Sequence, residues 1–354
     1  MKNKGKKLQI QLSVSVVLLC LVGALCGVIT WFSGVDFLYY LLLIPSVFCI
    51  VQLTSVFHEF GHYLSLKKGG FEVCYFKCSI FTVDKYGRKR IKVSLFGEHL
   101  GEIRFYPKKE VEYCKVLIKS LWSGIVGSVI IATVLNGVLA LSLLGVFGQS
   151  LSPYFSLIFS FAPYSLYALL INVIPWFHPE NDASKIVKIS GNKNNRVAID
   201  RFYAVQKQLF DGKTYSEIPS EYFFVDEEVS IDVKLVLLVY ALRRAVETSD
   251  LLAVEKLINS IESQNTLNDE ICCELLYNAI IRDDKNGIEK YSSVLKKDLD
   301  DSEPYVLRTT LANAKYVKDE QFFNVLKPTA LKICEGKTFF KGDALYNKKL
   351  IELL

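Results

Sequence analysis

Three long stretches of this chain contain no Asp, Glu, Lys or Arg, and they limit its fold more than any other feature. They are Leu8–Val35, Phe37–Phe57 and Ser120–Pro179, in a sequence of 354 residues. Because a bilayer core of about 30 Å needs roughly 20 apolar residues per helix, each of the first two stretches predicts one membrane span. The third is long enough for two spans, near Val116–Phe147 and Tyr154–Trp176, separated by a turn-rich segment. We therefore expect a mainly α-helical, polytopic membrane protein with about four spans.

The distribution of Lys and Arg predicts how these spans are oriented. Several lysines precede Leu8, and Lys67–Lys115 is rich in basic residues, whereas Ser33–Asp36 and Gly148–Pro153 have none. Since Lys and Arg concentrate in cytoplasmic loops, we expect a multi-pass protein of the cell membrane with both termini in the cytoplasm. The first apolar stretch is too long for the core of a typical signal peptide, so it is expected to remain as an anchor. The net charge of +5 then reflects topology and anionic headgroups of the lipid bilayer, and no nucleic-acid partner is expected.

Beyond residue 180 charged residues recur every few positions, which predicts a soluble part. We expect a membrane-embedded domain over residues 1–185 and a cytoplasmic α-helical domain over residues 186–354. Apolar residues at helical spacing, separated by short polar turns, favour an array of TPR-like helical hairpins that binds a protein partner or packs against the rest of the chain. The predicted helices are Val229–Thr248, Leu251–Ile261, Leu267–Ile281, Ile288–Leu295 and Pro304–Val317.

Between the second and third spans, Phe71–Lys115 has the apolar and polar alternation that is typical of strands. Ser79–Val83 and Arg90–Phe96 flank the turn segment Asp84–Arg88 and predict a small cytoplasmic β-hairpin, and Gly101–Tyr106 predicts a third strand. An exposed strand edge in this region would bind an extended peptide by strand addition. The alternative is that the region only connects two spans.

The segment His58-Glu59-Phe60-Gly61-His62 is the strongest indication of chemistry. Residues four positions apart in a helix lie on one face, so His58 and His62 would direct two imidazoles at a single zinc ion. Ionisable groups near a bilayer core are costly unless they are paired or bound to metal, which favours a functional site at the inner end of the second span. A zinc ion with three protein ligands keeps a fourth position for water, whose proton Glu59 would accept during peptide hydrolysis. The alternative is a helix end that simply faces water.

The third ligand must come from another part of the membrane domain. Candidates gather at the inner end of the fourth span, where His178, Glu180 and Asp182 follow Pro175. Imidazoles and carboxylates are both common zinc ligands, so residue type alone leaves these three candidates open.

These motifs resemble those of the site-2 protease family of intramembrane metalloproteases, the M50 peptidases. His58–His62, followed by the pair Gly69-Gly70, resembles the family's HExGH helix and its glycine turn. The small-residue stretch Ser123–Ser128 resembles the family's AGPxxN stretch, and the resemblance as a whole extends over about Phe37–Lys185.

The family's NxxPxxxxDG motif has a counterpart in Asn172, Pro175 and Asp182. By resemblance, Asp182 is the third zinc ligand and Asn172 helps to position the substrate. The chain departs from the family pattern where Ala183 replaces a glycine, where Ser128 replaces an asparagine, and in the longer spacing between Pro175 and Asp182.

Two functions are consistent with the sequence. The first is an intramembrane zinc metalloendopeptidase that cuts membrane-spanning or membrane-associated peptide substrates, as in regulated intramembrane proteolysis, with Zn2+ held by His58, His62 and Asp182 and with Glu59 as the catalytic base. The alternative is a non-catalytic membrane receptor or scaffold that has a degenerate metal site and signals through its cytoplasmic helical domain.

Overall fold

A computed structural model of the chain describes residues 21, 23–31, 41–78, 81–85, 91–93, 101–178, 180–230, 233–264, 268–295, 303–336 and 340–354. Contacts between residues divide the chain into two compact units, one up to Lys193 and one from Asn194 onward. The expected domain boundary after residue 185 falls inside a helix of the first unit, α6 (Asp182–Ser190). Each unit is described by itself below.

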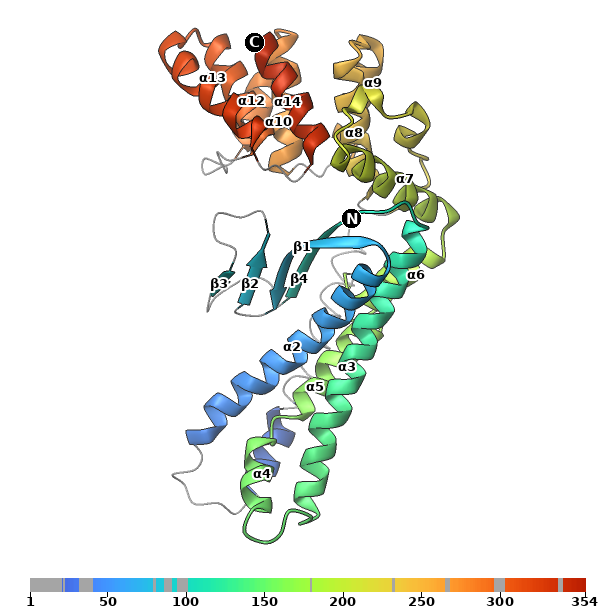
Figure 1. Ribbon diagram of the computed structural model, residues 1–354, viewed down its shortest axis with the longest axis vertical. Coiled ribbons are helices and arrows are strands. Elements are labelled where there is room, and N and C mark those ends of the chain that lie inside the picture. Colours follow the sequence, from blue (N-terminus) through green and yellow to red (C-terminus); the bar gives the residue numbers. More distant parts are fainter. Residues whose placement is uncertain are drawn as a thin grey trace. The chain divides into compact units, whose positions relative to one another are not determined.

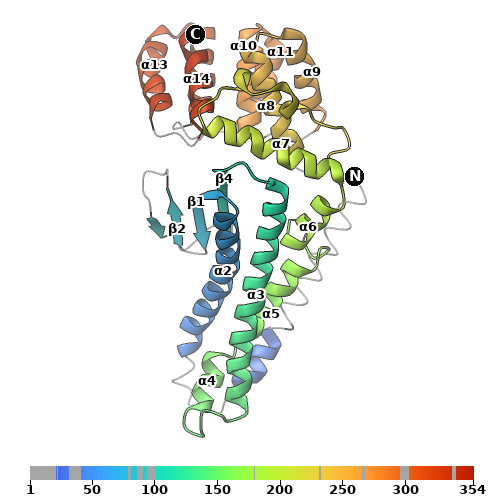
Figure 2. The same cartoon turned by 45° about the vertical axis from the view of Figure 1, so that its right-hand side comes forward.

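Two long apolar helices, α2 (Leu43–Lys68) and α3 (Tyr113–Leu143), lie side by side in the first unit (Figures 1 and 2). Both are long and apolar enough to cross a membrane. A side chain at Gly61 would overlap the carbonyl of Ser123, and one at Gly127 would overlap the carbonyl of Phe57. The two backbones therefore touch at these glycines, because no other residue type would fit there.

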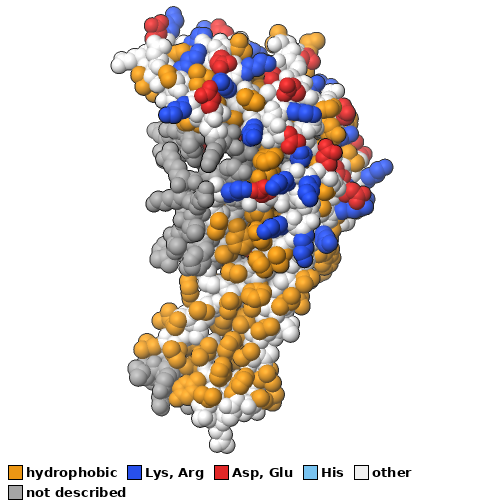
Figure 3. All heavy atoms as spheres, viewed as in Figure 1, with side chains coloured by type: hydrophobic (Ala, Val, Ile, Leu, Met, Phe, Trp, Pro, Cys, Tyr) orange, Lys and Arg blue, Asp and Glu red, His pale blue; other side chains and the backbone are white. Residues whose placement is uncertain are grey.

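The outer surfaces of these helices are apolar. Figure 3 shows hydrophobic side chains gathered over the helical part of this unit. On α2, for example, Phe48 is 45% exposed and Phe60 is 47% exposed. Apolar patches of this extent are rare on the surfaces of soluble monomers, which is consistent with a membrane location.

The third candidate span, Ser152–Val173, consists of two helices rather than the single helix that was expected. These are α4 (Ser152–Ile158) and α5 (Pro163–Val173). Pro163 begins the second helix, since its ring fits the first turn of a helix but not the interior. Asn136 of α3 donates its side-chain amide to the carbonyl of Ala162 at 3.3 Å, which satisfies one backbone acceptor at the break.

The second expected span corresponds to α2, which begins at Leu43 and continues past the His58–His62 motif to Lys68. The motif thus lies inside the helix rather than at its end. The described residues contain three candidate spans. Most of the first expected span, Leu8–Val35, lies outside the described residues, which include residue 21 and a helical part at 23–31.

Between α2 and α3 the chain forms a four-stranded antiparallel sheet with the order β3-β2-β1-β4. The expected hairpin is confirmed by the pairing of β2 with β3, in which Phe81 faces Val93. The expected third strand is β4, but it pairs with β1 and not with the hairpin. The strands are β1 (Phe71–Cys78), β2 (Phe81–Asp84), β3 (Ile91–Val93) and β4 (Gly101–Pro107).

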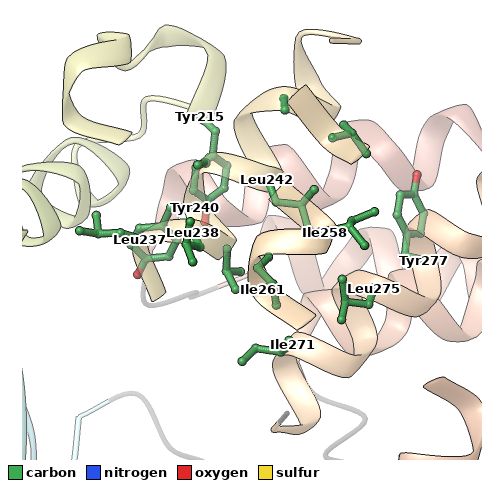
Figure 4. Close-up of a cluster of buried hydrophobic side chains, with 14 of the residues drawn as sticks. Tyr215, Leu237, Leu238, Tyr240, Leu242, Ile258, Ile261, Ile271, Leu275 and Tyr277 are labelled. Atoms are coloured by element: carbon green, nitrogen blue, oxygen red, sulfur yellow. The ribbon is translucent and has the colours of Figure 1, made fainter. Parts of the chain in front are cut away.

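The second unit is helical, as expected: α8 packs on α9, α10 packs on both α11 and α12, and α12, α13 and α14 pack on one another. Figure 4 shows Leu237, Leu242, Ile258, Ile261 and Leu275 gathered in its core. The expected helices after residue 229 are present with small differences at their ends. The elements are α7 (Lys193–Phe210), η2 (Tyr215–Glu217), η3 (Ser220–Phe223), α8 (Val233–Glu247), α9 (Leu251–Glu262), α10 (Asp269–Ile281), α11 (Lys285–Val294), α12 (Pro304–Tyr316), α13 (Glu320–Glu335) and α14 (Lys341–Leu353).

A buried charge network joins four helices of this unit. The Glu274 carboxylate of α10 lies 2.9 Å from the guanidinium of Arg243 in α8 and 2.8 Å from that of Arg308 in α12. Arg243 also pairs with Asp343 of α14 at 3.0 Å. Burial alone would raise the pKa of Glu274, but the two guanidinium groups outweigh it and hold that pKa below its ordinary value.

Candidate metal centre

His58 and His62 lie one turn apart on the same face of α2. Their rings meet edge to face, with centroids 4.8 Å apart, and their Nε2 atoms are 3.2 Å apart. The sequence prediction that the two imidazoles converge is therefore confirmed.

Helix α3 holds both imidazoles from the opposite side. The Nδ1 of His58 lies 3.1 Å from the carbonyl oxygen of Gly124 and 2.9 Å from the hydroxyl of Ser128. The Nδ1 of His62 lies 2.9 Å from the carbonyl oxygen of Ser120. A carbonyl oxygen can only accept a hydrogen bond, so each Nδ1 carries a proton, and in the neutral imidazole each Nε2 then keeps a lone pair. Both lone pairs point at the same small volume.

The carboxylate of Asp182 completes this cluster. Its Oδ2 lies 3.4 Å from the Nε2 of His58 and 3.2 Å from the Nε2 of His62. This oxygen is buried and accepts no hydrogen bond from the described residues. With both imidazoles neutral, three electron-rich atoms face one another, a cation between them would relieve their repulsion, and this donor set could hold a metal ion.

Asn181 places Asp182 at the first position of α6. Its side-chain oxygen accepts a hydrogen bond from the backbone amide of Ser184 at 2.7 Å, as a helix cap does. Its side-chain amide donates to the carbonyls of Ile171 and Ile174 near the end of α5. One buried side chain thus ties the start of α6 to the end of α5, and so fixes where the carboxylate points.

The two other candidate ligands lie apart from the cluster. His178 is exposed, and its Nδ1 accepts a hydrogen bond from the backbone amide of Glu180 at 3.2 Å. Glu180 is exposed and pairs with Lys188 at 3.4 Å. Asn172 is half-buried, and its side-chain amide donates to the carbonyl of Ala168 in its own helix at 3.1 Å. The structure brings only Asp182 to the two histidines.

Glu59 lies against the first residue of the sheet's edge strand. Its carboxylate occupies the place that a Cβ at Gly101 would fill. The sequence predicted Gly101 only as the start of a strand, since alternation within a strand carries no information about which helix lies beside it.

Small residues of α3 leave room for the cluster. A Cβ at Gly124 would overlap the His62 imidazole and would lie 3.0 Å from the Oδ2 of Asp182. Sequence reasoning noted the stretch Ser123–Ser128 as small, but it did not assign Ser120, Gly124 or Ser128 a role at the histidines. The spacing of these three by four residues was the available signal, because such positions form one face of a helix.

Comparisons of the chain with models of protein families, with curated proteins and with solved structures find no match. The assignment of a function therefore depends on the geometry of the site.

Proposed function

We propose that this protein is an intramembrane zinc metalloprotease that hydrolyses peptide bonds in membrane-spanning or membrane-associated peptides. The observation that carries the proposal is the buried Oδ2 of Asp182, which faces the lone pairs of His58 and His62 and has no hydrogen-bond donor among the described residues. Glu59, adjacent in sequence to one ligand, supplies a carboxylate that lies against the start of β4.

The donor geometry supports zinc in particular. Bonds of about 2.0 to 2.1 Å in a tetrahedral arrangement separate neighbouring donors by about 3.3 Å. The three donor atoms here are separated by 3.2, 3.2 and 3.4 Å. Two imidazoles and one carboxylate are also the ligand set of several catalytic zinc sites, in which a fourth position remains for water or substrate.

When bound, zinc supplies Lewis-acid chemistry: it makes water easier to deprotonate and polarises a carbonyl group. Glu59 lies within the same helix turn as both histidines, so its carboxylate can accept the proton of the attacking water and return it to the leaving amine. Hydrogen bonds from His58 to Gly124 and from His62 to Ser120 keep each Nε2 available to the metal.

The sheet supports a peptide as the substrate. β4 is at the end of the strand order and pairs with β1 on one side. Its first residue, Gly101, lies against Glu59. An extended peptide added along β4 would have its backbone beside the catalytic carboxylate, whereas a helical peptide would hide its carbonyl groups.

The proposed topology follows the positive-inside rule. Four spans, including one before residue 36, would place both termini and the second unit in the cytoplasm. We propose that the helical pairs of this unit, which include α8 with α9 and α10 with α11, form a TPR-like domain that binds a protein partner and selects substrates. Deletion of residues 194–354 would then alter substrate choice.

The test uses full-length protein purified from membranes. We expect about one zinc ion per chain in the wild type and in Glu59→Gln, and loss of zinc in His58→Ala and in Asp182→Ala. Membranes with wild-type protein should contain peptide cleavage products that are absent from membranes with Glu59→Gln. The Glu59→Gln protein should stay bound to the uncut substrates. Identical peptides from both membranes would overturn the protease proposal. Zinc-free protein with full cellular function would instead support the receptor or scaffold.

A further inference from the structure

A basic cavity of about 660 Å³ lies where α2 ends and the sheet begins. Four lysines contribute to its walls in two adjacent pairs, Lys67 with Lys68 at the end of α2 and Lys108 with Lys109 just after β4. The three candidate metal ligands are absent from its lining. The cavity is therefore a second candidate site.

The charge of this cavity is not balanced within the described residues. Glu72 is the one acidic residue in its lining, and it is already paired with Lys85 and with Lys108. No ion pair among the described residues involves Lys67, Lys68 or Lys109. Like charges held close together repel one another, and an anion in the cavity removes this cost.

Backbone hydrogen bonds hold the two lysine pairs together. The amides of Lys108 and Lys109 donate to the carbonyl oxygen of Gly70 at 2.9 and 3.2 Å. Gly70 has a φ of +87°, a conformation that a side chain would strain. This turn directly follows the lysine pair of α2, so the walls of the cavity are fixed by the fold.

The surface of α2 before the cavity is apolar. Phe60 and Leu64, two turns and one turn before the lysines, are 47% and 41% exposed. In an amphiphile such as a phospholipid, acyl chains contact an apolar surface while the phosphate reaches the basic groups at the bilayer boundary. α2 offers both surfaces in that order.

We propose that this cavity binds a phosphate group, and that the phosphate belongs to the headgroup of an anionic phospholipid. That the phosphate comes from a lipid depends on the proposed membrane insertion of α2, whereas binding of a phosphate group depends on the lysines alone. A bound phosphate joins the end of α2 to the segment after β4. Glu59 lies in α2 and Gly101 in β4, the strand that this segment follows, so lipid binding stabilises the arrangement of the proposed catalytic carboxylate.

The test measures saturable binding of fluorescent phosphatidylglycerol to full-length protein in neutral detergent at fixed ionic strength. The variant is Lys68→Gln with Lys109→Gln. The matched control, Lys115→Gln with Lys119→Gln, removes the same charge from the first turns of α3 outside the cavity. Since each lysine near an anionic headgroup contributes about 1 kcal/mol, the variant should bind phosphatidylglycerol about 30-fold more weakly, and the control should bind like the wild type.

Two competition arms distinguish the sources of phosphate. We expect phosphatidylcholine to compete poorly and inorganic phosphate to compete only at far higher concentration. Equal affinity for inorganic phosphate would retain the phosphate site and overturn the lipid as its source. Equal losses in variant and control, or no saturable binding at all, would overturn the site itself. Zinc content measured on the same samples keeps this result separate from the fate of the protease proposal.

Discussion

The carboxylate of Glu59 in α2 lies at the position that a side chain of Gly101 in β4 would need. The proposed catalytic base and the start of the edge strand are thus in direct contact, although 41 residues separate them in the sequence. In the proposed function, a peptide that pairs with this strand would have its backbone beside this base.

Gly101→Ala tests this contact. The new methyl group must displace the Glu59 carboxylate, whose side chain is the movable partner, while the metal ligands remain in place. Because a positioned base contributes about 10²- to 10⁴-fold, cleavage of substrates captured by Glu59→Gln should fall by about 100-fold with zinc content unchanged. Gly137→Ala is the matched control, since beyond the adjacent backbone of its own helix its added Cβ would meet no described atom within 4 Å. Full activity in Gly101→Ala would contradict the role of the contact.

Gly124→Ala should remove the metal itself. Its Cβ would overlap the His62 imidazole and crowd the Oδ2 of Asp182, so the three donors could not keep their separations. We expect folded protein with little zinc, measured by elemental analysis and circular dichroism, again against Gly137→Ala. Normal zinc content in Gly124→Ala would contradict this prediction, because it would show that the cluster binds zinc despite the added methyl group.

Ser128→Ala should weaken zinc binding without abolishing it. The hydroxyl lies 2.9 Å from the Nδ1 of His58, but the carbonyl of Gly124 still orients the ring. Loss of such a supporting group typically costs 10- to 100-fold in metal affinity, and we expect a loss of about 10-fold in a chelator competition. Ser123→Ala removes a hydroxyl that bonds the carbonyl of Lys119 in its own helix, and it should change nothing. Equal affinities for the two variants would argue against the hydrogen bond.

Glu274→Gln should destabilise the second unit. The change leaves the buried guanidinium groups of Arg243 and Arg308 without their shared counter-ion, which typically costs about 3 to 5 kcal/mol. Glu335→Gln removes an exposed partner of Lys348 and should cost less than about 1 kcal/mol. Urea unfolding of full-length protein, followed by far-ultraviolet circular dichroism, measures both. If the unfolding free energies of the two variants differed by less than the experimental error, this prediction would be wrong.

The same carboxylate predicts how stability depends on pH. The guanidinium groups hold the pKa of Glu274 below its value in the unfolded chain despite burial, so the unfolded state binds the proton more readily. The stabilisation is complete above the unfolded pKa and declines as pH falls through the folded pKa. Unfolding free energy measured from neutral to acid pH should therefore fall at acid pH in the wild type and fall less steeply in Glu274→Gln. Parallel curves would contradict this assignment.

The sequence predicted features that depend on neighbouring residues, and it missed contacts between residues that are far apart in the chain. The facing of His58 and His62, the pairing of β2 with β3 and the helices from Val233 onward all follow from local periodicity. The pairing of β1 with β4 joins Phe71 to Pro107, and no local pattern specifies that partner. The sequence predicted one uninterrupted span across Pro163, because it does not show that Asn136 would satisfy an exposed carbonyl at a break there.

The position of Asp182 could be predicted in part. The polar cluster after Pro175 indicated that a ligand lies there, but His178 and Glu180 carry suitable groups too. The choice depends on Asn181, whose side chain bonds backbone groups on both sides and starts α6 at the next residue. A capping residue is visible in a sequence, whereas the carbonyls that its amide reaches are not.

The glycine contacts between α2 and α3 determine when the metal site is assembled. Gly61 and Gly127 each face a carbonyl of the other helix, and the two contacts bracket His58 along α2. Sliding one helix past the other would drive a side chain into the opposite backbone, so the histidines keep their depth relative to Ser120, Gly124 and Ser128. The entropy of arranging the two imidazoles is lost when these helices pack, before the proposed zinc ion binds. The two histidines of the proposed centre are therefore preorganised, and we expect any motion that admits a substrate to come from elements other than this helix pair.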